Sequence, residues 1–190
     1  MLCLVPTPIG NLEDISKRSL RVLMEAELIF CEDTRVTKKL LNLLGEKNNL
    51  DFSNKEFKSF HSHNENHILQ SLDKETFSKN VVYVSDAGMP CVSDPGATLV
   101  DYCIKNQIPY DVLPGANAIL TAYAMSGFSH TTFSFYGFLD HKGASRASKL
   151  SDVLNDDKLA ILYESPHRLL KLLEELKEKE PNRTIFLAKE

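Results

Sequence analysis

The chain has 190 residues, of which 43% are hydrophobic and 25% are charged, so it can bury the core of one large domain or two small ones and is not typical of a disordered protein. Its formal net charge of -4 at pH 7 excludes a protein that coats nucleic acid with one broad basic face, while local basic patches stay compatible with it. The apolar stretches are of strand length and no signal peptide is visible, so we expect a soluble, cytoplasmic protein without a membrane span.

The first 115 residues alternate between strand-like and helix-like patterns. The expected strands are short apolar or β-branched runs at residues 2–5, 28–31, 57–60, 81–84 and 110–113. We expect helix starts at Asp14, Thr34, Asn64 and Asp94-Pro95, with Gly45 ending the second helix. This alternation predicts a mainly parallel sheet.

The pattern changes after Pro114-Gly115. A short helix ending near Gly127 is followed by residues 133–138, where aromatic and small side chains alternate as in a half-buried strand. We therefore predict two α/β domains, residues 1–115 and 116–190, the first mainly parallel and the second mixed. The chain stops directly after a strand-like run, so we expect the C-terminal domain to be incomplete.

Four loops of Pro, Gly and small polar residues follow predicted strands. They span residues 6–11, 85–96, 114–118 and 164–168. Ligands of open α/β sheets bind beyond the carboxyl ends of strands, and small residues let the backbone approach them closely. One such loop is only a turn, and Ser165-Pro166 also reads as an ordinary helix start. Four together indicate a cleft lined from several strand ends.

Two further polar segments carry candidate chemistry. Glu32-Asp33-Thr34-Arg35 sets two carboxylates and a guanidinium at a strand end, which is compatible with a capped helix start or with a proton acceptor beside a phosphate ligand. Residues 61–67 hold three histidines and one glutamate but no adjacent Asp-His pair. We read this segment as a substrate-facing loop or a plain helix start and assign no metal site.

Several cofactors are excluded by missing or incomplete motifs. Residues 7–11 lack the three-glycine spacing of a dinucleotide fingerprint, and no Walker-type Gly-Lys-Ser/Thr run is present. Cys3, Cys31, Cys91 and Cys103 lack paired metal-ligand spacing, so we expect reduced thiols in the core.

Taken in order, five motifs resemble those of the tetrapyrrole (corrin/porphyrin) methylase superfamily, and specifically of its members that methylate small-subunit ribosomal RNA. The motifs are residues 5–12, residues 32–35, residues 85–90 with 93–96, residues 114–118 and residues 163–168. The resemblance spans essentially the whole chain. It implies two α/β domains, usually in a homodimer, with S-adenosylmethionine bound in the cleft between the domains.

The same resemblance implies a function and a set of donor-binding positions. The implied reaction is 2′-O-methylation of a decoding-centre cytidine in the 16S rRNA of the small ribosomal subunit. The implied donor-binding positions are Pro8, Ile9, Gly10, Asp86, Ala87, Gly88, Met89, Val92, Asn117, Ala118 and Glu164. Met89 and the pair Ala116-Asn117 depart from residues common in the family, and both are small changes in a pocket lined by backbone.

A ribose hydroxyl is a poor nucleophile, so a carboxylate or histidine should help to remove its proton. Asp33 is our first candidate for this base, followed by Glu32, Asp86 and His63. The candidates for RNA contacts are Arg35, His61, Lys142, Arg146 and Arg168, with His63 and Tyr136 as alternatives for stacking on a splayed base.

Two other functions stay open at this point. One keeps the fold and the methyl donor but takes a tetrapyrrole or another small substrate, for which the basic residues 141–149 are awkward. The other is a non-catalytic RNA-binding module.

Overall fold

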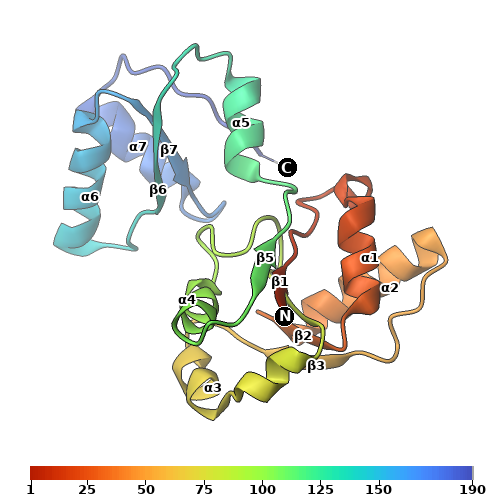
Figure 1. Ribbon diagram of the computed structural model, residues 1–190. Coiled ribbons are helices and arrows are strands. Elements are labelled where there is room, and N and C mark those ends of the chain that lie inside the picture. The colour runs from red at the N-terminus through yellow and green to blue at the C-terminus, as the bar shows by residue number, and fades with distance from the viewer. Residues whose placement is uncertain (190) are drawn as a thin grey trace. The chain divides into compact units, whose positions relative to one another are not determined.

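The computed structural model describes residues 1–189, which divide into two compact units, residues 1–118 and 119–189. Each unit is built around its own parallel sheet (Figure 1). The predicted α/β class with a mainly parallel first sheet is therefore confirmed. Among residues 1–189, no helix is both long and apolar enough to cross a membrane.

The first unit alternates strands and helices as predicted. Its strands are β1 (Leu2–Leu4), β2 (Leu28–Cys31), β3 (Glu56–Ser59), β4 (Val81–Val84) and β5 (Tyr110–Val112). Its helices are α1 (Lys17–Glu25), α2 (Thr34–Asn48), α3 (Glu65–Ser71) and α4 (Ala97–Lys105), with short 3-10 helices η1 (Leu12–Asp14) and η2 (Lys74–Ser78). The strands lie in the order β3-β2-β4-β1-β5, and every paired neighbour is parallel.

Helices cover both faces of this sheet because its strands are apolar on both sides. Alternate strand residues such as Cys3, Ile29 and Val82 pack with Leu23 of α1 and Leu41 of α2. The residues between them, among them Leu4, Phe30 and Tyr83, pack with Leu99 of α4 and with Phe60 and Phe77. The near-continuous burial of β2 and β4 is typical of parallel strands between two helical layers.

The second unit is smaller. It contains α5 (Ala118–Ser126), β6 (Phe133–Phe138), α6 (Gly143–Asn155), β7 (Leu159–Tyr163) and α7 (Leu169–Lys179). β6 and β7 pair in parallel. Their core is formed with apolar residues of α6 and α7, chiefly Leu150, Val153, Leu172 and Leu176.

Three helix boundaries of the first unit differ from the sequence prediction. Ser16 rather than Asp14 caps α1, and Asp33 rather than Thr34 caps α2, because in each case the side-chain oxygen accepts a backbone N–H of the first turn. Gly45 does not end α2. It lies inside the helix, where an added Cβ would come within 2.6 Å of the Leu50 carbonyl oxygen.

Two helix starts predicted from proline lie further along the chain. α4 begins after Gly96, at φ 120°, because residues 91–96 turn back over Tyr83 before the helix can start. α7 begins after Arg168, because residues 165–168 form a turn in which the Arg168 N–H donates to the Ser165 carbonyl over 2.9 Å.

Candidate active site

Three of the loops predicted to bind a ligand meet at the carboxyl edge of the first sheet. β1 lies between β4 and β5, so the loops that follow these strands, residues 85–96, 5–11 and 113–118, are neighbours (Figure 1). This edge is where open α/β sheets bind their ligands. The predicted convergence therefore holds for the three loops of the first unit.

Thr7 joins two of these loops directly. Its backbone exchanges two hydrogen bonds of 3.0 Å with Gly88, and its hydroxyl donates to the Ser85 carbonyl over 3.3 Å. Thr7 and Ser85 are both 1% exposed. Sequence reasoning placed neither among the site residues, because a threonine beside prolines reads as an ordinary turn residue.

Glycines make the meeting point of the loops narrow. At Gly88, with φ +84°, an added Cβ would lie 3.1 Å from Ile9 Cγ2 and 3.8 Å from the Ala116 carbonyl oxygen. At Gly115, an added Cβ would lie 2.6 Å from Cβ of Pro6. Without side chains at these glycines, the backbones of the three loops pack closely together. A ligand that is recognised mainly through main-chain groups requires such access to the backbone.

The donor-binding positions predicted in the first unit all fall on these loops or at their ends. They are Pro8, Ile9, Gly10, Asp86, Ala87, Gly88, Met89, Val92, Asn117 and Ala118. Pro8 and Gly88 are buried, Gly10 and Ala87 are exposed, and the others are half-buried. The narrow space around Gly88, between Ile9 and Ala116, is called the glycine cradle below. This cradle, the small residues of the loops and the half-buried Asp86 carboxylate fit a donor such as S-adenosylmethionine, which carries both apolar and cationic groups.

A second junction links the loop after β4 to the end of β2. The Asp86 carboxylate accepts the Asp33 backbone N–H over 3.2 Å, and the Asp86 backbone N–H acts to lower the pKa of the Glu32 carboxyl. Because β2 and β4 are adjacent strands, this contact fixes two carboxylates of the candidate site next to the donor loops.

Asp33 is held by the residue two positions further on. Its Oδ1 accepts the Arg35 backbone N–H over 2.8 Å, and its two oxygens accept from Arg35 Nε over 3.1 Å and Nη2 over 2.7 Å. These hydrogen bonds with Arg35 lower the pKa of the Asp33 carboxyl to about 2. Asp33 is therefore a strong helix cap and a weak base.

Glu32, Asp86 and Asp94 have the opposite tendency. Burial is the largest cause that raises the pKa of each, and the neighbouring carboxylates raise it further. For Glu32 these neighbours are Asp86, Asp94 and Asp33. The site thus combines one carboxylate that stays ionised with three that bind protons more readily.

The histidine-rich loop follows β3 at the same sheet edge. His61 Nδ1 accepts the His63 backbone N–H over 3.2 Å, so its Nε2 carries the proton when the ring is neutral. The two rings meet edge to face, with centroids 5.9 Å apart. Within residues 1–189, no group of three or more His, Cys, Asp or Glu side chains is arranged to hold a metal ion.

Asn64 holds this loop in place, and sequence reasoning missed its role. Its Oδ1 accepts the His61 backbone N–H over 2.8 Å, and its Nδ2 donates to the Ser59 carbonyl over 3.1 Å. An asparagine five residues after a strand end is a recognisable turn signal, and it could have marked the fixed loop.

In the second unit, the predicted site residues Glu164, Arg146 and Arg168 form a buried ion-pair network. Glu164 lies 2.7 Å from Arg168 and 3.6 Å from Arg146, which also pairs with Glu175 at 2.7 Å. Arg146 is 3% exposed. Phosphate binding by Arg146 and donor binding by Glu164 stay predictions, and burial in this network counts against both.

Lys142 differs from these residues because it is exposed. It precedes α6 without capping it through its side chain. Arg35 is also exposed, with 89% of its side chain accessible despite the ion pair with Asp33. These two cations, together with the half-buried His61, stay predicted contacts to RNA.

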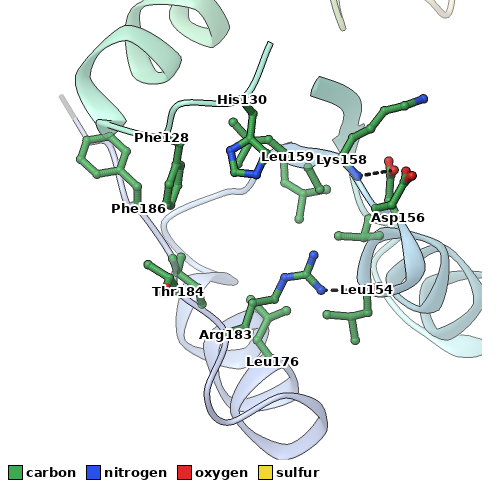
Figure 2. A pocket seen from close by; sticks show the side chains of 15 residues that line it. Phe128, His130, Leu154, Asp156, Lys158, Leu159, Leu176, Arg183, Thr184 and Phe186 are labelled. Carbon is green, nitrogen blue, oxygen red and sulfur yellow. Dashed lines mark hydrogen bonds between the residues drawn. The ribbon is translucent and has the colours of Figure 1, made fainter. Parts of the chain in front are cut away.

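The second unit also contains a cavity of about 470 Å³ between β7 and residues 183–186. Figure 2 shows Phe128 and Phe186 on one side of it and Asp156 on the other. Arg183 is anchored by a 2.9 Å hydrogen bond to the Leu154 carbonyl. No residue predicted for the site lines this cavity.

Comparison with known proteins gives consistent matches over the whole chain. A family model described as Tetrapyrrole (Corrin/Porphyrin) Methylases matches residues 1–190. The ribosomal RNA small subunit methyltransferase I of Campylobacter fetus is 50% identical, over 100% of this chain and 70% of that protein. The proteins of that name from Helicobacter pylori strain 26695 and Thermotoga maritima are 45% and 41% identical, over 100% of this chain and 71% and 82% of their own lengths.

Proposed function

The chain belongs to the tetrapyrrole (corrin/porphyrin) methylases and, within them, to the ribosomal RNA small subunit methyltransferase I family, and from this membership we propose that it methylates the ribose 2′-hydroxyl of a decoding-centre cytidine in 16S rRNA. It is an S-adenosylmethionine-dependent methyltransferase. Identity of 41 to 50% to ribosomal RNA enzymes favours this substrate over a tetrapyrrole or a non-catalytic role.

One structural observation carries the proposal: the narrow glycine cradle between Ile9, Gly88 and Ala116 lies on the same sheet edge as the carboxylates of Glu32 and Asp86. When bound, S-adenosylmethionine supplies an electrophilic methyl group on a sulfonium. The bare backbone around Gly88 would hold the donor, and the Asp86 carboxylate would attract its cationic portion. Such a reaction depends on alignment more than on metal activation.

The acceptor needs a base and contacts to RNA. Glu32, Asp33 and His63 come from adjacent strand ends, and each is a candidate to remove the hydroxyl proton. Arg35 and Lys142 would contact phosphates, and His61 would donate a hydrogen bond from Nε2 to an unstacked base or ribose.

We propose also that the enzyme acts in the cytoplasm, on small ribosomal subunits, as a homodimer. The apolar helix α5 supports the dimer, because Leu120 and Met125 are 54% and 67% exposed on it. Sedimentation equilibrium of the purified chain tests this assembly, and a mass of one chain across the micromolar range would contradict it.

Binding and transfer test the proposed function together. Isothermal titration with S-adenosylmethionine and S-adenosylhomocysteine should give about one site per chain. Small subunits isolated without the modification should then accept a radiolabelled methyl group on one cytidine ribose, located by mass spectrometry of RNA fragments. Absence of donor binding, or transfer to another nucleotide, would contradict the proposal.

A matched pair of glycine variants links the activity to the cradle. Gly115→Ala should weaken donor binding by about tenfold or more, because the new Cβ must displace Pro6 and the loop that carries Ile9. In Gly127→Ala the new Cβ meets nothing within 4 Å, and although the φ of +70° makes alanine strained there, Gly127 lies outside the donor loops, so donor binding should be unchanged.

A further inference from the structure

Two carboxylates stand next to each other in the sequence at the end of β2, and their surroundings differ. Both oxygens of Asp33 are occupied by Arg35, and one of them also caps α2. The partial positive charge of the helix N-terminus favours the ionised form further. Proton transfer from a hydroxyl to Asp33 would weaken these charge-assisted hydrogen bonds, so the ionised Asp33 carboxylate is a poor proton acceptor.

Glu32 is held in place but keeps acceptor capacity. Its carbonyl accepts the Ser59 hydroxyl of β3 over 3.1 Å, and the Asp86 backbone N–H beyond β4 acts to lower the pKa of its carboxyl. Within residues 1–189, the Glu32 carboxylate forms no ion pair with a lysine or arginine, in contrast to Asp33. A carboxylate has about four acceptor positions, so one backbone N–H leaves room for a substrate hydroxyl.

The charged and titratable groups around Glu32 also favour proton uptake. Asp33 follows it on its own segment, while Asp86 and Asp94 face it from the loop after β4. Tyr83 of β4 lies within the electrostatic influence of Glu32 and Asp94, and its buried hydroxyl has no hydrogen-bond partner among residues 1–189. Like charges and partial burial raise the pKa of the Glu32 carboxyl.

We propose that Glu32 is the catalytic base that accepts the ribose 2′ proton and that Asp33 serves to cap α2. This inference rests on the proposed function. The oxygen–methyl bond forms as the oxygen–hydrogen bond breaks, and the proton passes to a Glu32 carboxylate oxygen. The electron pair of the broken sulfur–methyl bond stays on sulfur, and Glu32 later releases the proton to water.

The free protein gives the first test, independent of the donor. Carboxyl carbon NMR of the wild-type chain and of Glu32→Gln identifies the Glu32 resonance as the one that disappears. This resonance should titrate above the usual glutamate value of about 4.3. Titration at or below that value would overturn the proposal.

Single-turnover methyl transfer to small subunits gives the second test. Glu32→Gln should slow transfer by about 100-fold or more, flatten the rise of rate with pH and leave donor affinity unchanged. Above pH 5 it should be at least as stable as wild type, because it removes a carboxylate from among like charges. Glu46→Gln, at an exposed position of α2, should keep the wild-type rate.

The remaining outcomes separate the two proposals. If the wild-type chain transfers methyl groups and Glu32→Gln stays within about threefold of its rate, the base assignment alone is overturned. A folded Asp33→Asn protein that loses as much activity as Glu32→Gln also overturns it, because asparagine still caps α2. A wild-type chain that binds the donor and methylates no ribosomal RNA overturns the proposed function and the base with it.

Discussion

The carboxylate of Asp33 stabilises the start of helix α2, and the same hydrogen bonds make it a weaker proton acceptor. The sequence favoured it as a base because it follows a strand and precedes an arginine, and the same two facts make it a helix cap paired with that arginine. A motif names the neighbours of a carboxylate but not which of them its oxygens face. That step requires the backbone geometry of the first turn of α2.

The depressed pKa of Asp33 predicts a pH dependence of stability. Because its folded pKa, about 2, lies below the unfolded value of about 3.9, its contribution is fully present above the unfolded value and is lost as pH falls through the folded one. Urea unfolding from pH 2 to 6 should therefore show the wild-type advantage over Asp33→Asn shrinking toward low pH. A constant difference between the two proteins would contradict this reading.

Two buried or half-buried tyrosines make a matched pair for hydroxyl removal. Tyr83→Phe should leave the free energy of unfolding unchanged or raise it by up to about 1 kcal/mol, because the hydroxyl it removes has no partner within residues 1–189. Tyr102→Phe should lower it by about 1 kcal/mol, because the Tyr102 hydroxyl donates to the Leu72 carbonyl over 2.9 Å. If denaturant titrations show that both variants lose the same free energy of unfolding, the Tyr83 hydroxyl must have a hydrogen-bond partner.

At the scale of elements, helix α2 continues past a residue that normally ends helices. Gly45→Ala should destabilise the chain by about 1 to 3 kcal/mol, although alanine has the better helix propensity by about 1 kcal/mol, because the new Cβ meets a backbone oxygen 2.6 Å away. Leu43→Ala, at an exposed position of the same helix, is the control. A more stable Gly45→Ala protein in urea unfolding would show that residues 49–52 adapt easily.

The ion-pair network of α6, α7 and the 164–168 loop gives another test at this scale. Arg146→Met should lower the free energy of unfolding by about 3 to 5 kcal/mol, because it leaves the buried Glu164 with one fewer cation. RNA affinity of the folded fraction should change little. A stable variant with much weaker RNA binding would instead support the phosphate contact expected from the sequence.

At the scale of the whole molecule, the order of elements was predictable and the order of strands in space was not. Strand residues such as Val81-Val82-Tyr83-Val84 are apolar on both faces, and that pattern correctly indicated a parallel sheet under two helical layers. Which strands are neighbours depends on long-range packing. The motif loops at residues 6–11 and 85–96 were identified, whereas the Thr7–Gly88 bridge that joins them required the structure.

The position of β1 between β4 and β5 bears on how the chain is made. Among the strands of residues 1–189, β1 pairs only with β4 and β5, which are synthesised about 80 and 110 residues later at a rate of several residues per second. During translation, the first strand emerges well before either partner exists and has nothing to pair with for several seconds. The nascent chain thus presents an apolar segment to its surroundings, and the sheet edge that carries the candidate site can assemble only when synthesis has passed β5.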